Sequence, residues 1–412
     1  MELYFISVIF IIFVIIELFF YLIVRFVNKK FQWLITTKDE EPILSKDGLK
    51  KFILNGYDGE LGWTRKPNTL GIEDGKDCTT KWTINPKGCR TNPDFEKLNS
   101  TISCYGDSFT FCRQVNDDET WEHYLSKSQK TNVQNFGVGN YGLDQALLRI
   151  KREYPKNKTN IVILAIVPDT INRILSSWKH YNEYGNTFAF KPRFVLKNNN
   201  LEFIRNYIDT KTKFENYTEF ISKIKNTDFF YKQKFKKDII SFPYSVTIFK
   251  NPLRNFQIIF WVIIIESLKK LKKDVKKIEW NPMKIIMKIN LLWRVKLYQN
   301  KESVMLLEKI INDYVSYAKL NNFVPFFILF PQKDDAIFIK NNFHFYQNFV
   351  NIISEIDDLV VIDMTEKLLL ENNLDLFYSD DNDYGGHFSK IGNQLMANII
   401  NEKIENFINA NE

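Results

Sequence analysis

The sequence is poor in the residues that hold metal ions and disulfides. It has 4 Cys and 4 His among 412 residues, and its cysteines form no CxxC pair and have no nearby histidine cluster. Because zinc and iron–sulfur sites need such ligands at short spacings, we predict no metal site. Cys78 and Cys89 could pair in an oxidising compartment, but nothing in the sequence requires it, and the question stays open.

A strong charge bias is also lacking. The formal net charge of +7 is modest for 412 residues, and there is no zinc-finger spacing, RNP-like motif or Arg-rich arm. These absences argue against nucleic acid as a partner. What the chain does have is apolar material, 45% hydrophobic and 15% aromatic residues, enough to bury a large core in two or three units.

One long apolar run stands near the start. Residues 3–24, LYFISVIFIIFVIIELFFYLIV, contain a single charge, Glu17. The run is long enough to cross a hydrocarbon core of about 30 Å. No basic segment precedes it and no A-x-A-like site follows, so we predict a single-pass membrane anchor over 1–30 that contacts the lipid bilayer, rather than a cleaved signal peptide. A buried core helix is the other interpretation.

The orientation of this anchor rests on few charges. Three basic residues follow the run, which by the positive-inside rule favours a cytoplasmic body: Arg25, Lys29 and Lys30. Three charges are too few to exclude a body on the outer face, so the side of the membrane is left open.

The remainder predicts an α/β fold. Residues 31–99 are rich in turn-formers and Trp and are expected to pack on the main domain. Apolar runs then alternate with helical stretches, which predicts a flavodoxin-like parallel sheet of order 2-1-3-4-5 with helices on both faces. The runs are 101–105, 132–137, 160–167, 324–330 and 359–364.

A long interval separates the third and fourth runs. We assign 175–320 to a largely helical insertion or cap, and 100–174 with 321–412 to the α/β domain. Within the interval, the apolar stretch 256–265 is too short to span a membrane and leads into a lysine-rich segment. It is either a cap helix with a solvated basic face or an interfacial helix that touches anionic headgroups.

A serine at the end of the first apolar run is the candidate nucleophile. The stretch TISCYGDSFTFCR (101–113) ends in Gly106-Asp107-Ser108. Reacting groups gather beyond the carboxyl ends of parallel strands, and a following helix would point its N–H groups at a developing anion. A turn in which Ser108 only caps a helix is the alternative.

The candidate base lies near the other end of the chain. His387 stands in DDNDYGGHFSKIGN (380–393), after the fifth run and therefore at the same sheet edge as Ser108. A serine hydroxyl needs a base to take its proton, and the base needs an acceptor on its other ring nitrogen. Asp383 is the candidate acceptor. The remaining histidines are interpreted as surface or packing residues: His123, His180 and His344.

Three stretches together resemble the SGNH (GDSL-type) hydrolase superfamily: GDSF at 106–109, NFGVGNYGLDQALLR at 135–149 and DYGGHFSKIGN at 383–393. The resemblance implies a three-layer α/β/α fold, a Ser–His–Asp triad and an oxyanion hole. It also implies esterase, lipase, thioesterase or acyl-transfer chemistry without a metal or organic cofactor.

Position by position, the resemblance makes Ser108 the nucleophile and its N–H the first oxyanion donor. The second donor is Asn140, where the family has glycine, or Gly139 if the alignment shifts by one. The family's third donor is an asparagine after the third strand, but that turn reads IVPDTINR here. Three residues of this turn are candidate substitutes: Thr170, Asn172 and Arg173.

The acid of the triad also departs from the family pattern. Asp383 precedes His387 by four positions instead of three, and Tyr384 stands where the family has its aspartate. The reserves are Asp380 and Asp381. Asp107 is expected to order the nucleophile loop.

These features predict a membrane-anchored serine hydrolase or acyltransferase that forms an acyl-enzyme on Ser108. The expected substrate is an O-acyl (acetyl) ester of carbohydrate or another small ester. Two alternatives stay open: a weakly active or inactive SGNH fold that binds glycan in envelope assembly, and a membrane lipase or thioesterase.

Overall fold

The computed structural model describes residues 2–30, 37, 39, 41–183, 185–371, 373–380, 384 and 386–411. The chain forms two compact units. The helical unit consists of Met1–Leu44, Trp178–Ala189 and Thr218–Leu292; the α/β unit consists of Ser45–Ser177, Phe190–Tyr217 and Trp293–Glu412. Residues 190–217 and 293–320, which the sequence analysis assigned to the insertion, therefore lie in the α/β unit.

A five-stranded parallel sheet is the centre of the α/β unit. Its order is β11-β10-β7-β5-β6, and every neighbouring pair is parallel. In chain order this is the 2-1-3-4-5 arrangement, so the predicted fold class is confirmed. The strands are β5 (Ile102–Gly106), β6 (Val133–Asn135), β7 (Ile161–Ile166), β10 (Val324–Leu329) and β11 (Val360–Asp363).

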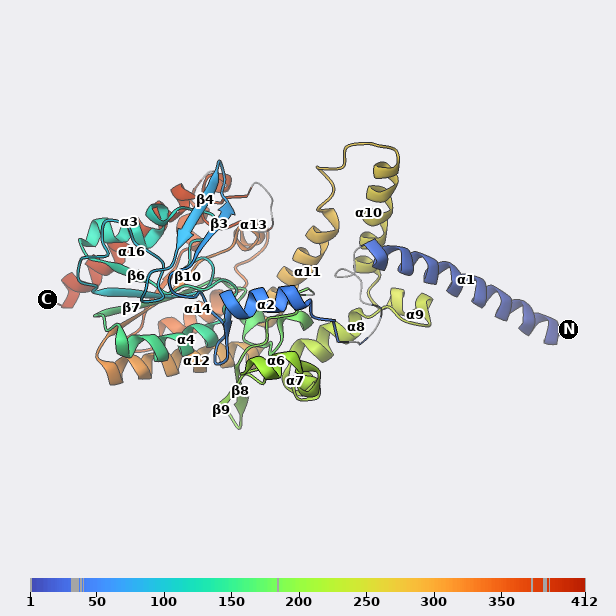
Figure 1. The fold of residues 1–412 in the computed structure, drawn as a ribbon, viewed down its shortest axis with the longest axis horizontal. Coiled ribbons are helices and arrows are strands. Elements are labelled where there is room, and N and C mark those ends of the chain that lie inside the picture. The colour runs from blue at the N-terminus through green and yellow to red at the C-terminus, as the bar shows by residue number, and fades with distance from the viewer. Residues whose placement is uncertain are drawn as a thin grey trace. The chain divides into compact units, whose positions relative to one another are not determined.

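Helices cover both faces of this sheet (Figure 1). On one face α3 (Trp121–Gln129) packs against α16 (Lys390–Asn411), and on the other α4 (Leu143–Glu153) packs against α12 (Lys301–Asn321). All six residues of β7 are buried, as a central strand between two helical layers requires. The result is a three-layer α/β/α sandwich.

Smaller elements complete the α/β unit. Two antiparallel ribbons, β1–β2 and β3–β4, and the helix α2 come from its N-terminal segment. The bounds are α2 (Lys46–Asn55), β1 (Tyr57–Asp58), β2 (Gly62–Trp63), β3 (Leu70–Asp74), β4 (Thr79–Thr83), α5 (Thr170–Arg173), β8 (Arg193–Lys197), β9 (Asn200–Ile204), α6 (Lys211–Glu215), α13 (Lys333–Asn341), α14 (Gln347–Ser354) and α15 (Thr365–Leu369).

The helical unit is organised around α1 (Glu2–Lys30). Val24 and Val27 of this helix share a buried cluster with Ile258 and Val262. The other helices of the unit are α7 (Ile221–Thr227), α8 (Lys236–Asp238), α9 (Tyr244–Phe249) and α10 (Pro252–Lys270), and α11 (Asn281–Tyr298) crosses from this unit into the α/β unit.

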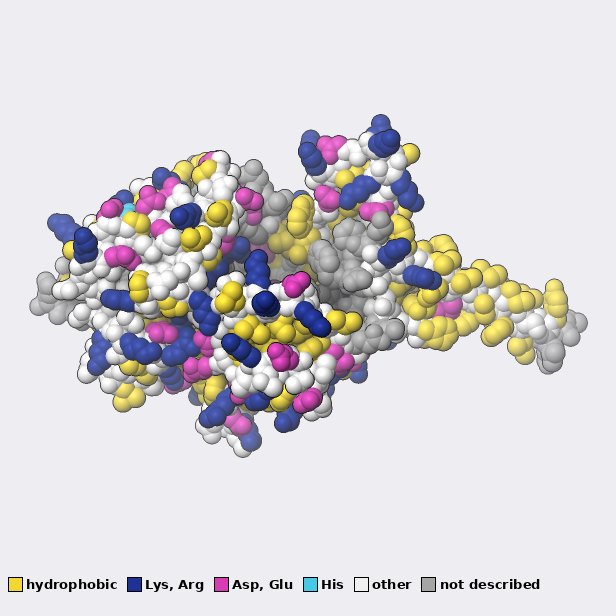
Figure 2. Space-filling view, viewed as in Figure 1, with side chains coloured by type: hydrophobic (Ala, Val, Ile, Leu, Met, Phe, Trp, Pro, Cys, Tyr) yellow, Lys and Arg dark blue, Asp and Glu magenta, His cyan; other side chains and the backbone are white. Residues whose placement is uncertain are grey.

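The first helix is apolar enough to cross a membrane. Within Tyr4–Lys29, an 18-residue window has a mean hydropathy of 3.0, and 6% of that window is buried inside the protein. It is the one candidate membrane span among the described residues. Hydrophobic side chains cover its surface in Figure 2. An apolar helix near the N-terminus fits a membrane anchor or a signal sequence by length and composition.

Candidate functional site

The nucleophile loop begins where β5 ends. Gly106 lies so close to β7 that a Cβ there would come within 1.7 Å of the Ala165 carbonyl oxygen, so only glycine fits. Ser108 follows and is 7% exposed. The expected helix is absent: residues 108–114 form successive turns, and α3 begins only at residue 121. Cys112 and Gln114, with φ of 56° and 68°, adopt left-handed conformations that a helix does not allow.

Asp107 fastens this loop to its surroundings. Its Oδ1 accepts a hydrogen bond from Phe109 N (2.8 Å), and its Oδ2 accepts from Val167 N (3.0 Å) and Arg173 Nη1 (3.0 Å). Burial raises the pKa of Asp107, and the charge of Arg173 opposes that rise. The Asp107 carboxylate thus fixes the backbone on either side of Ser108.

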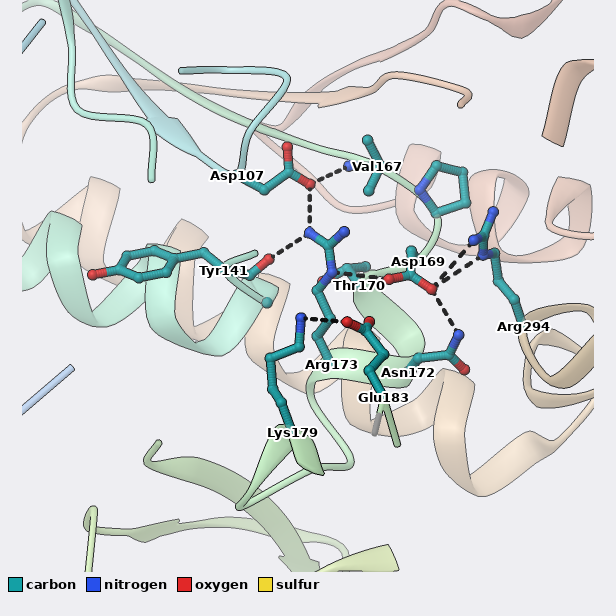
Figure 3. A network of polar contacts seen from close by, with 12 residues as sticks. Asp107, Tyr141, Val167, Asp169, Thr170, Asn172, Arg173, Lys179, Glu183 and Arg294 are labelled. Atoms are coloured by element: carbon teal, nitrogen blue, oxygen red, sulfur yellow. Dashed lines mark hydrogen bonds and ion pairs between the residues drawn. The ribbon is translucent and has the colours of Figure 1, made fainter. Parts of the chain in front are cut away.

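A buried ionic network extends from Asp107 along the sheet edge (Figure 3). Arg173 donates from Nε to Asp169 Oδ2 (2.9 Å) and from Nη1 to the Tyr141 carbonyl (3.0 Å). Arg294 lies 3.3 Å from Asp169 and also donates to Asp335. Arg173 therefore joins two carboxylates, Asp107 and Asp169, and so ties the turn after β7 to the nucleophile loop, while Arg294 ties the same turn to α13.

The other two candidates for the third oxyanion donor also bind inside the protein. Thr170 Oγ1 accepts from Leu143 N (2.8 Å), and Asn172 Nδ2 donates to Asp169 Oδ1 (2.7 Å). These contacts position the turn, and with those of Arg173 they engage all three residues in structural hydrogen bonds.

The loop after β6 lies beside the serine. A Cβ on Gly139 would be 3.9 Å from Ser108 Cβ, and Val138 N donates to the Gly106 carbonyl (3.0 Å). Asn140 has φ of 66°, the left-handed conformation that asparagine tolerates in place of glycine. Trp63 Nε1 donates to the Gly139 carbonyl (2.9 Å), so the β1–β2 ribbon holds this loop in position.

His387 reaches the nucleophile loop from the far end of the chain. Its ring packs on Phe109, the neighbour of Ser108, with 4.9 Å between ring centroids. Its Nδ1 lies 2.9 Å from Gln114 Oε1, which also accepts from His387 N (3.0 Å). Gln114 Nε2 donates to the Asp74 carbonyl (3.2 Å), which fixes the orientation of the amide.

This arrangement sets the chemistry of the imidazole. An amide oxygen only accepts, so His387 Nδ1 carries the hydrogen and Nε2 keeps its lone pair. Burial, with the charges of Arg113 and Arg173, lowers the pKa of His387 to about 3. The ring is therefore neutral at pH 7 and has the tautomer that a general base needs.

Gln114 is the partner of His387 that the sequence did not predict. No motif marks it, and the only signal is its place a few positions after Ser108. Asp383 and Asp381 lie outside the described residues. The reserve Asp380 has its backbone oxygen bonded to Lys333 Nζ (2.9 Å).

The four cysteines and the other three histidines make no contact with His387 that the structure describes. The four cysteines are free thiols, with Cys78 exposed and the other three buried. Where the structure describes the chain, no group of three or more His, Cys, Asp or Glu side chains is placed to hold a metal ion. The remaining histidines contact neighbouring side chains: His123 with Asn92, His180 with Trp178 and His344 with Asp363.

No protein-family model and no curated protein matches the chain. Among solved structures, it is similar to one described as a lipolytic protein of the G-D-S-L family from Desulfitobacterium hafniense DCB-2, with 12% identity, a TM-score of 0.34, and coverage of 74% of this chain and 99% of that one. It is also similar to the psychrotrophic esterase EstA from Pseudoalteromonas sp. inhibited by monoethylphosphonate, with 10% identity, a TM-score of 0.32, and coverage of 76% and 99%.

Proposed function

We propose that this chain is an SGNH-type ester hydrolase that works through an acyl-enzyme on Ser108. The observation that carries the proposal is the placement of His387, whose ring is held by Gln114 and packs on Phe109, the residue after Ser108. A serine nucleophile needs a base of suitable tautomer, and His387 is the candidate because its ring packs on the residue that follows Ser108.

The reaction follows from these positions. His387 Nε2 takes the proton of Ser108 Oγ as that oxygen attacks the acyl carbon. The backbone N–H groups of Ser108 and Asn140, or of Gly139, hold the resulting oxyanion. The intermediate then breaks its bond to the alcohol, which leaves with the proton from His387. Water, deprotonated by the same nitrogen, releases the acid and restores Ser108.

Two groups are candidates to orient His387. Gln114 accepts from its Nδ1, and Asp383 is the acid predicted from the sequence. A neutral amide holds the tautomer but stabilises the imidazolium less than a carboxylate does. We assign the positioning role to Gln114.

The substrate class in this proposal is an O-acyl ester of carbohydrate, such as an acetyl ester, or another small ester. With α1 as a membrane anchor, the enzyme would work close to a bilayer. If a sugar hydroxyl replaces water in the second step, the same site is an O-acyltransferase.

The test is active-site labelling of the full chain in detergent with a fluorophosphonate, together with turnover of an aryl acetate. We expect Ser108→Ala to lose the label and at least ~10⁴-fold in rate. Ser128→Ala, at an exposed position of α3, should behave as the parent. If the parent protein neither takes the label nor turns over the ester faster than Ser108→Ala, the proposal that this chain is an ester hydrolase is refuted.

Two further candidates have specific observations behind them. A weakly active glycan-binding fold is favoured by the turn after β7, where Thr170, Asn172 and Arg173 all bind inside the protein. A membrane lipase or thioesterase is favoured by the apolar helix α10. Glycan binding without labelling would support the first, and a preference for long acyl chains would support the second.

A further inference from the structure

A cavity of about 570 Å³ opens beside the oxyanion loop. Its lining includes Val138, Gly139 and Asn140 from the loop after β6, and residues of α2 and the two N-terminal ribbons. Two of the lining residues are neighbours of Ser108: a Cβ on Gly139 would lie 3.9 Å from Ser108 Cβ, and Arg113 N donates to the Ser108 carbonyl (3.2 Å).

The charges that line this cavity do not balance. Lys51, Arg65 and Arg113 face it, with Glu73 as the single carboxylate in its lining. Glu73 Oε2 lies 2.7 Å from Arg113 Nε, while its Oε1 is 4.0 Å from Arg65 Nη2. One negative charge is thus shared by two arginines, and Lys51 adds a third positive charge.

Arg65 packs against two aromatic rings. Its guanidinium lies 4.3 Å from the ring centroid of Trp82 and 4.7 Å from that of Phe111, which fixes its direction. Burial lowers the pKa of Arg65 to about 10 although Glu73 favours its charge. An anion entering the cavity would replace the hydration that this charge has lost.

Aromatic side chains complete the lining. Trp63 and Phe52 face the cavity beside the cations. A ring face next to a cation suits a sugar that carries an acidic group, because the ring covers the C–H face and the cation pairs with the acid.

We propose that this cavity binds the carboxylate of an acidic carbohydrate, such as a uronate residue, and so places its O-acyl group at Ser108. This inference rests on the proposed function. It narrows the substrate from esters of carbohydrate in general to esters of anionic carbohydrate.

The test uses binding first, because binding does not need turnover. Full-length Ser108→Ala is titrated by calorimetry with methyl glucuronoside, with methyl glucoside and with inorganic phosphate. We expect the uronoside to bind about tenfold more tightly than the neutral sugar, and the difference to shrink at high salt. Binding of phosphate alone would mean a general anion site and would overturn the uronate assignment.

Matched variants identify the site. Lys51→Gln and Arg65→Gln should each weaken uronoside binding about three- to tenfold. Lys50→Gln, exposed on the same helix but outside the cavity lining, should leave it unchanged. Equal binding of the two sugars, or equal effects of Lys50→Gln and Lys51→Gln, would overturn the inference.

Kinetics on the parent chain separate this inference from the proposed function. A 3-O-acetyl uronoside should show a lower KM than the matching glucoside, with Lys51→Gln raising KM for the uronoside only. Selective binding of the uronoside without any turnover would refute the proposed hydrolase function but support the anion-binding cavity. Turnover of both esters with equal KM would support the hydrolase function and refute the anion-binding cavity.

A separate observation concerns the helical unit. α10 exposes an apolar stripe on one face, while its opposite face packs in the cluster with Val24 and Val27 of α1. Large apolar side chains are also exposed on α9 and at Phe242, which lies just before this helix. The exposed residues are Phe242, Val246, Phe249, Leu253, Phe256, Phe260 and Ile263.

Glu17 ties these helices to the apolar span. It is 6% exposed, and its Oε1 accepts from Ser245 N (3.0 Å), while its Oε2 accepts from Tyr244 N. The first N–H groups of α9 therefore lie level with the middle of the Tyr4–Lys29 stretch. If α1 crosses a bilayer, the start of α9 therefore lies at the depth of the bilayer's hydrocarbon core.

We infer that α9 and the exposed stripe of α10 lie in the same bilayer leaflet as the C-terminal half of α1, with lipid acyl chains over the apolar residues. The lysines at the end of α10 and just after it, Lys269, Lys270, Lys272 and Lys273, would then meet headgroups. The bilayer contact thus involves more than one crossing helix.

Spin labels test this in vesicles of phosphatidylcholine and phosphatidylglycerol. Phe249→Cys and Phe260→Cys are labelled in a Cys78→Ser background, since the other three cysteines are buried. We expect both labels to favour collision with oxygen over a water-soluble nickel chelate. Leu320→Cys, 82% exposed in the α/β unit, should show the opposite. Labels at 249 and 260 that behave like the one at 320 would overturn the inference.

Discussion

Two buried carboxylate sites, one in each unit, are stabilised by different means. In the α/β unit, Asp107 and Asp169 are paired with the buried guanidinium of Arg173. In the helical unit, Glu17 accepts from backbone N–H groups at the start of α9. At Asp107 and Asp169 an opposite charge compensates the carboxylates, whereas at Glu17 the peptide dipoles of a helix end do so.

The difference explains what each arrangement can position. An arginine between two carboxylates restrains three segments at once, and a charge left alone in a low dielectric is costly. A carboxylate on backbone N–H groups restrains a single helix end, and needs no second charge inside an apolar unit. The ionic form therefore suits a reaction site, and the backbone form suits a helix contact among apolar residues.

The largest effect is expected at Arg173. Arg173→Met would leave Asp107 and Asp169 buried with less counter-charge, so we expect a loss of about 3–5 kcal/mol in the free energy of unfolding of the α/β unit. Urea denaturation with and without the change measures it. Arg152→Met, at a partly exposed pair with Asp58, should cost about 1 kcal/mol or less. Equal costs would show that the buried network is not special.

Gln114 tests whether the site depends on one neutral acceptor. Gln114→Leu removes the partner of His387 Nδ1, and we expect kcat/KM to fall about 10- to 100-fold with little change in KM. Gln114→Glu should recover most of the rate if the role is orientation.

The pH profile adds a readout that a folding defect would not imitate. Because burial lowers the pKa of His387 to about 3, the acid limb of kcat/KM should lie well below the usual histidine range. A glutamate at position 114 should move that limb upward, since an anion stabilises the imidazolium. An unchanged limb in Gln114→Glu would contradict the assigned contact.

Glu17 offers the corresponding change in the helical unit. Glu17→Leu leaves the first N–H groups of α9 without their acceptor, at a cost of about 1–3 kcal/mol in local opening. Hydrogen exchange at residues 244–249 measures that opening. Glu17→Gln keeps one acceptor oxygen and should have the smaller effect, and equal exchange in both variants would argue against the contact.

Glu122 shows a third way to bury a carboxyl group, as the neutral acid. Burial raises its pKa to about 8, well above the unfolded value, so the folded state holds a proton that the unfolded state has lost. Its contribution is complete below the unfolded pKa and is lost as the pH rises through the folded pKa. Relative to Glu122→Gln, the parent should lose about 1.4 kcal/mol between pH 6 and pH 7. Parallel stability profiles would contradict this.

The sheet was predictable because its central strands are continuous apolar runs. β7 and β10 are buried on both faces, and a parallel sheet built by right-handed crossovers leaves few possible orders. Ser108 and His387 followed from the same rule, since both come after strands whose carboxyl ends share one edge.

The missed features depend on contacts between distant residues. His387 and Gln114 are 273 residues apart, and no local pattern joins them. The turns after Ser108 replaced the expected helix because Cys112 and Gln114, neither of them glycine or asparagine, are held in left-handed conformations. The cavity forms where the N-terminal segment packs beside the loop after β6, and the composition of the sequence does not predict that packing.

The hydrogen bond from Trp63 to the Gly139 carbonyl has a practical consequence for anyone redesigning this protein. Trp63 lines the cavity and also holds the loop beside Ser108. In the proposed enzyme, a change at Trp63 would therefore alter both substrate selectivity and the rate of the reaction at Ser108. A library that varies the cavity together with Trp63 would return slow variants whatever their affinity. Selection for a new substrate should keep Trp63 constant and vary Lys51 and Phe52, which line the same cavity from α2.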